Sequence, residues 1–245
     1  MDEKKSVPSL GTPVAIVIAG LVIAGAVVYG NYQTPAPKAE TEGGNWTALF
    51  ENLEPVSASE HIQGSPSAPI TIIEYSDLEC PYCKVFHQVM NQYMASKQDG
   101  EVAWVYRHFP LDSIHTKARP EAVAAECANS LGGNTAFWQF IDELFTITPS
   151  NDGLDLAQLP VIAEKIGLDV TAFNTCLDSE APAEQVADDY NRGLEIGVDG
   201  TPFVIVVGPS GQAYPIFRQD PSTIEEKEVQ TIIADLMNLY NVELQ

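Results

Sequence analysis

The chain has 245 residues, of which 45% are hydrophobic and 19% charged, which fits one or two globular domains and excludes a largely disordered chain. Its 34 acidic and 12 basic residues give a formal net charge of -22. This charge argues against binding to nucleic acid or anionic lipid, because phosphate groups are held by clustered Lys and Arg. The four cysteines are too sparse for a disulfide scaffold, so they predict one reactive site and one structural bridge.

An uncharged apolar run follows the polar residues 1–13, which we assign to the cytoplasm. At about 1.5 Å per residue, a helix over residues 14–32 approaches the thickness of a bilayer core, and we predict a transmembrane anchor there. The alternative is a cleaved signal peptide, since Ala24-Gly25-Ala26 has the small-x-small pattern of a cleavage site. Both alternatives place the rest of the chain outside the cytoplasm, as a single-pass cell-membrane protein or as a secreted one.

Residues 33–55 begin with Pro, Gly and charged residues and are predicted to be a flexible linker to a folded domain over residues 56–240. In that domain the β-branched run at residues 70–77 predicts a buried strand. A helix with apolar side chains at helical spacing follows, and residues 101–109 form the next predicted strand. The resulting β-α-β unit has a cysteine pair at its strand-to-helix junction.

A block of amphipathic helices is predicted from about residue 113 to 197, because Ala-rich and Leu-rich stretches are punctuated there by Gly and Pro. The predicted helices are residues 117–131, 134–147, 155–166, 169–177 and 182–196. A strand at residues 202–207, its hairpin partner at 212–218 and a last helix at 222–240 complete the domain. The pattern predicts an α/β fold with an inserted all-helical subdomain.

The motif Cys80-Pro81-Tyr82-Cys83 begins the helix that joins the two predicted strands of the β-α-β unit. Zinc sites usually need a second ligand pair of similar spacing, and Cys127 and Cys176 are each isolated, so we predict no metal and no cofactor. Free N–H groups and the helix dipole stabilise a thiolate on Cys80, while Cys83 lies one turn inward and can attack a mixed disulfide. The motif therefore predicts a redox-active pair.

The sequence resembles the DsbA-like thioredoxin family over about residues 56–240, and most closely its membrane-anchored or secreted members related to BdbD. Three segments carry the resemblance: HIQGSPSAPITIIEYSDLECPYCKVFH, YRHFPL and VDGTPFVIV. It implies a thioredoxin-like fold with a helical insertion, Cys80 as the exposed nucleophile and Cys83 as the resolving thiol. It also implies that Thr201-Pro202 is a cis-proline loop that faces the cysteines and pairs with a substrate peptide.

We expect one acidic residue near the motif to be buried and another to be exposed. Glu74 stands at the position of the family's buried acid, where it would accept or relay the proton of Cys83. The alternative for Glu74 is a solvent-facing strand residue. Glu79 directly precedes Cys80, and we expect it to be exposed and to oppose thiolate formation slightly.

Cys127 and Cys176 lie on predicted helices of the insertion, and some members of the family that this sequence resembles carry a second bridge there. We expect a structural disulfide between them, with two buried reduced thiols as the alternative. His108 and His115 flank the FPLD loop and are expected to be ordinary histidines of the core or surface. A contribution of this loop to the substrate groove is the alternative.

These features predict a dithiol oxidase that introduces disulfides into reduced, exported proteins. It would act as a monomer without nucleic acid and need a membrane reoxidase of the DsbB or vitamin K epoxide reductase-like type. The dipeptide Pro81-Tyr82 is that of glutaredoxins, whereas the best-known strong oxidants of the family carry Pro-His. A reductase or isomerase is therefore the first alternative, and a non-enzymatic binding protein or chaperone is the second.

Overall fold

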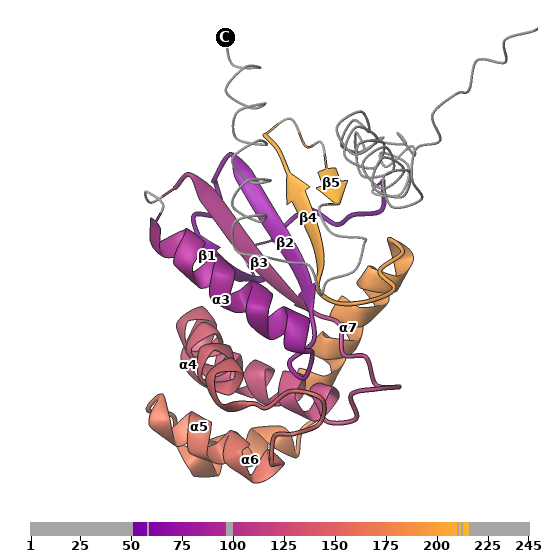
Figure 1. Cartoon of the computed structure of the whole chain (residues 1–245). Coiled ribbons are helices and arrows are strands. Elements are labelled where there is room, and N and C mark those ends of the chain that lie inside the picture. The colour runs from indigo at the N-terminus through magenta and orange to yellow at the C-terminus, as the bar shows by residue number, and fades with distance from the viewer. Residues whose placement is uncertain (1–50, 58, 97–99, 210, 212, 216–245) are drawn as a thin grey trace, which may run out of the picture. The chain divides into compact units, whose positions relative to one another are not determined.

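The computed structural model describes residues 51–215 apart from 58, 97–99, 210 and 212 (Figure 1). The predicted segment 1–13, the anchor, most of the linker and the last predicted helix lie outside these residues. Within the described part of the chain, no helix has the length and apolar character needed to cross a membrane.

Five strands form one sheet in the order β1-β3-β2-β4-β5. The strands are β1 (His61–Gly64), β2 (Ile70–Ser76), β3 (Val102–His108), β4 (Phe203–Val207) and β5 (Ala213–Pro215). Strands β2 and β3 are parallel and joined by helix α3 (Pro81–Ser96), whereas the other pairs are antiparallel. The predicted thioredoxin-like α/β fold is confirmed, and the short edge strand β1 is the element that the sequence pattern missed.

The helical block follows β3. It contains α4 (Ala118–Ile147), the short 3-10 helix η1 (Leu156–Gln158), α5 (Leu159–Lys165), α6 (Val170–Leu177) and α7 (Ala181–Glu195). The two helices predicted at 117–131 and 134–147 form the single element α4, which leaves helical geometry at Gly133 with φ 71° and ψ -171°. In Figure 1, α4 lies between α3 and the α5–α6 pair.

Strands β2 and β3 bury both of their faces. On one face, Ile72 and Trp104 belong to a core that includes α3 and α4, and on the other, Ile73 and Val105 belong to a core that includes Ile196 at the end of α7. Glu74 shares the face of Ile72 because side chains two residues apart point the same way. The sheet therefore directs this carboxyl group toward the core that also contains both reactive cysteines.

Candidate active site

The cysteine pair stands where β2 ends and α3 begins. The carbonyl of Cys80 accepts the first helical hydrogen bond, from the N–H of Lys84 at 3.1 Å, so Cys80 is the N-cap residue. Pro81 follows as the first helical residue, where its missing N–H costs nothing. Both cysteines are free thiols, and Cys83 lies within the first turn.

The two thiols have opposite acidities. A hydrogen bond with the Cys83 thiol is the largest influence on Cys80 and lowers its pKa to about 6. Burial works against this shift, whereas hydrogen bonds from the backbone of Cys83 and Tyr82 and the nearby Thr201 side chain reinforce it. The pKa of Cys83 is raised well above its usual value, first by burial and then by the hydrogen bond and charge of Cys80. At neutral pH the reduced pair therefore consists of one thiolate and one thiol.

The Thr201-Pro202 loop lies against Cys80. The Thr201-Pro202 peptide bond is cis, and Cys80 Sγ lies 3.5 Å from the Thr201 carbonyl oxygen, to which it donates when it is protonated. Only 3% of Cys80 is exposed, so the expectation of an exposed nucleophile is wrong for this structure. The Thr201-Pro202 loop lies over Cys80, whereas the neighbouring residue Tyr82 is 38% exposed.

Glu74 is fully buried, which excludes the solvent-facing alternative. One carboxylate oxygen accepts from Ser76 Oγ at 2.6 Å, and the other accepts from Trp104 Nε1 at 3.1 Å. Burial raises the pKa of Glu74 to about 8, although both hydrogen bonds lower it. The charge of Glu74 also contributes to the high pKa of Cys83. A carboxyl group with this pKa can both give and take a proton near neutral pH.

Asp77 organises the turn before the cysteines, a role that sequence reasoning missed. Its carboxylate accepts from the backbone N–H groups of Glu79 and Leu111, each at 2.7 Å, and its Oδ2 lies 3.0 Å from His115 Nδ1. The N–H of Asp77 donates to Cys83 Sγ at 3.4 Å. Burial raises the pKa of Asp77. Burial lowers the pKa of His115, but the hydrogen bond and the charge of Asp77 outweigh it, so the pKa of His115 is raised overall. His115 is thus a buried, paired histidine that fixes the loop after β3.

Glu79 is fully buried, so the expectation of an exposed charge is wrong. The loop after α4 covers it: Gly153 N–H donates to Glu79 Oε2 at 3.2 Å, and Asn151 N–H donates to the Glu79 carbonyl at 2.8 Å. Glu121 of α4 is also buried, and burial, with the hydrogen bond and charge of Glu79, raises its pKa to about 10. Glu121 is therefore protonated at neutral pH, and the two carboxyl groups do not repel each other as a pair of anions.

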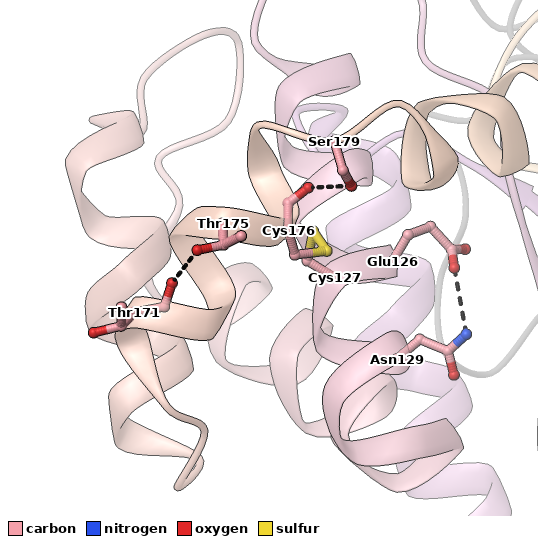
Figure 2. The surroundings of a disulfide bond; sticks show 7 residues. All are labelled: Glu126, Cys127, Asn129, Thr171, Thr175, Cys176 and Ser179. Atoms are coloured by element: carbon pink, nitrogen blue, oxygen red, sulfur yellow. Dashed lines mark hydrogen bonds between the residues drawn. A yellow bond between two sulfur atoms is a disulfide. The ribbon is translucent and has the colours of Figure 1, made fainter.

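The second cysteine pair is bridged (Figure 2). The sulfur atoms of Cys127 on α4 and Cys176 on α6 are 2.09 Å apart, and the two residues are separated by 49 positions in the sequence. The bridge joins two helices of the insertion. Cys80 and Cys83 remain free for chemistry.

The family model described as Thioredoxin matches residues 57–226. A Na(+)/H(+) antiporter NhaA 3 of Salinispora tropica is 33% identical over 175 residues, which are 71% of this chain and 26% of that protein. The chain thus spans about a quarter of the length of the curated relatives it matches.

Two solved structures extend these matches. DsbA2 of Pseudomonas aeruginosa is 27% identical, with a TM-score of 0.60 over 75% of this chain and 97% of that one. Oxidised BdbD of Bacillus subtilis is 21% identical, with a TM-score of 0.61 over 74% of this chain and 95% of that one, and this likeness concerns the fold alone.

Proposed function

We propose that this chain, which belongs to the thioredoxin family and is a thiol-disulfide oxidoreductase of DsbA-like fold, oxidises dithiols in exported proteins. The observation that carries the proposal is the unequal acidity of the two thiols at the start of α3. A Cys80 thiolate with a pKa near 6 is a good leaving group, and stabilising it favours the reduced form of the pair, which makes the disulfide form an oxidant.

The reaction begins with the Cys80–Cys83 disulfide. A substrate thiolate attacks Cys80 Sγ, a mixed disulfide forms, and the Cys80–Cys83 bond breaks with its electron pair on Cys83. A second substrate thiolate then attacks the substrate sulfur of the mixed disulfide, and Cys80 leaves as a thiolate. The substrate loses two electrons and becomes a disulfide, and the cysteine pair gains them.

Glu74 has a role in the first step. The sulfur released there belongs to Cys83, which is fully buried and has a pKa well above its usual value. A buried thiolate is costly, so the sulfur takes up a proton. Glu74, protonated below about pH 8 and electrostatically linked to Cys83, is the donor we assign. When the pair is reoxidised, the proton returns from Cys83 to Glu74.

We place this chemistry outside the cytoplasm. The apolar residues 14–32 support a membrane anchor, and the Cys127–Cys176 disulfide supports an oxidising compartment. The substrates would be reduced, exported proteins that pair with the Thr201-Pro202 loop. Continued turnover needs an electron acceptor, for which we propose a membrane reoxidase of the DsbB or vitamin K epoxide reductase-like type. The antiporter activity named for the relatives is not transferred, because the chain matches only 26% of the first of them.

A reductase or isomerase is the second candidate, and two observations favour it. Tyr82 occupies the position at which a histidine would stabilise the thiolate with positive charge. The pKa of about 6 for Cys80 lies between the values of about 3.5 for DsbA and about 7 for thioredoxin.

The test is the oxidation of a reduced, unfolded substrate protein by the oxidised full chain. Cys80→Ser and Cys83→Ser should each abolish substrate oxidation, because neither variant can form the Cys80–Cys83 disulfide that accepts the electrons of the substrate. The matched control is Cys127→Ala/Cys176→Ala, which removes two cysteines away from the site and should retain oxidation. A Cys80→Ser variant as active as the wild type would falsify the proposal.

A further inference from the structure

Three buried side chains from distant parts of the sequence converge beside the sheet. His61 lies on β1, His108 at the end of β3 and Glu126 on α4, and their exposed fractions are 4%, 1% and 3%. One nitrogen or oxygen atom of each lies within 4.8 Å of the others. No regular sequence spacing links them, so the sequence pattern alone does not reveal them.

Both imidazoles are directed at the same carboxylate oxygen. His61 Nε2 lies 2.6 Å from Glu126 Oε1, and its ring stacks on Phe137 with centroids 3.4 Å apart. His108 Nε2 lies 3.2 Å from the same oxygen, at the distance of an ion pair, but without the geometry of a well-formed hydrogen bond. A buried nitrogen without a hydrogen-bond partner is uncommon and requires an explanation. A metal ion within the cluster would take up the lone pair of this nitrogen.

We propose that His61, His108 and Glu126 bind a zinc-like divalent transition-metal cation. Two imidazole nitrogens and one carboxylate oxygen form a typical zinc donor set, and a water molecule would take the fourth position. Calcium and magnesium prefer sites made of oxygen ligands. Zinc bonds of about 2.0–2.1 Å place tetrahedral ligand atoms roughly 3.3 Å apart. The observed separations, from 2.6 Å to at most 4.8 Å, bracket that value, so small side-chain movements suffice.

The surroundings balance the charge of such an ion. Glu126 supplies one negative charge, and Asp189 of α7, 3% exposed, lies against His108 and accepts its backbone N–H at 3.0 Å. The second oxygen of Glu126 accepts from Asn129 Nδ2 at 3.4 Å, which helps to orient the carboxylate (Figure 2). Two neutral imidazoles with two carboxylates would therefore leave a divalent cation close to neutral.

The ion would connect the edge strand β1 to the helical insertion. A second connection already exists, because Asn134 accepts from the N–H of Ile62 at 3.0 Å and donates to its carbonyl at 2.7 Å. Cys127, next to Glu126, ties the same helix to α6. A metal that binds only the folded chain stabilises it, so we assign a structural role, separate from the redox chemistry of Cys80 and Cys83.

The test is a titration of the chelator-treated full chain with Co²⁺, followed by competition with Zn²⁺. The chain is kept oxidised so that Cys80 and Cys83 cannot bind metal as thiolates. We expect one equivalent of Co²⁺, visible bands of a four-coordinate nitrogen and oxygen site without sulfur charge transfer, and a higher unfolding temperature with Zn²⁺. His108→Gln should weaken binding by more than about tenfold, the lower end of what loss of an outer-shell partner costs. His87→Gln, which alters another buried histidine paired with a carboxylate, should bind as the wild type does.

A second measurement covers the case in which the His108 variant does not fold. The chain has four histidines, His61, His87, His108 and His115. In the ¹⁵N spectrum of the oxidised wild type, Zn²⁺ should shift the ring signals of His61 and His108 and leave those of His87 and His115 in place. If Zn²⁺ does not bind stoichiometrically, or if it shifts the ring signals of His87 and His115 instead, then His61, His108 and Glu126 form a hydrogen-bonded cluster that binds no metal.

Discussion

The carboxyl group of Glu74 links stability, pH and catalysis in a way that one substitution can test. Burial raises its pKa from 4.5 to about 8. Glu74→Gln keeps the size of the side chain and an oxygen that can accept from Trp104 Nε1, while its amide can donate to Ser76 Oγ. The variant therefore removes the titration of this group and little else.

The magnitude follows from the two pKa values. The folded state holds this proton more tightly than the unfolded state, so the stability that it contributes is fully present below pH 4.5 and is lost as the pH rises to about 8. At about 1.4 kcal/mol for each unit of pKa, the loss amounts to about 5 kcal/mol. A glutamine at this position does not titrate, so the variant escapes the loss.

The assay is denaturant unfolding of the oxidised full chain at several pH values. We expect the difference in free energy of unfolding, Glu74→Gln minus wild type, to increase as the pH rises from 4.5 to 8 and to remain constant above pH 8. The pKa of about 8 includes a contribution from the charge of reduced Cys80, so the gain should reach about 5 kcal/mol in the reduced chain and be smaller in the oxidised one. The control Glu164→Gln, on an exposed position of α5, should follow the wild type. Parallel curves for Glu74→Gln and the wild type would refute the reasoning.

Three further predictions concern the two cysteine pairs. Alkylation of Cys80 in the reduced chain should rise with pH to a plateau, with a midpoint near 6, and a midpoint near 9 would contradict the lowered pKa. Thr201→Val removes a nearby hydroxyl group that lowers the pKa of Cys80, so this midpoint should move to higher pH; no movement would argue against that influence. Cys127→Ala/Cys176→Ala opens a loop with a sequence separation of 49 and should cost about 4 kcal/mol in urea unfolding, and a loss below about 1 kcal/mol would show that the bridge adds little.

The features that sequence reasoning predicted correctly have local causes. The β-branched run of β2 and the apolar spacing of α3 determine the strand-to-helix junction within about thirty residues. Pro81 at the first helical position fixes where that helix starts. The place of Cys80 relative to Cys83 follows from these elements alone.

The features that it missed depend on contacts between distant segments. Glu79 is buried by residues near Gly153, and Cys80 is covered by Thr201. Strand β1 has too few β-branched residues to be recognised and forms because β3 offers it an edge. Alternation did not settle the direction of Glu74, because β2 is buried on both faces.

The reduction potential of the Cys80–Cys83 pair, equilibrated with glutathione in the full chain, tests the proposed direction of electron flow most directly. The stabilised Cys80 thiolate predicts a potential less negative than about -200 mV, on the side of the oxidants, with DsbA at about -120 mV. A potential near that of thioredoxin, about -270 mV, would contradict the proposed oxidase and favour a reductase.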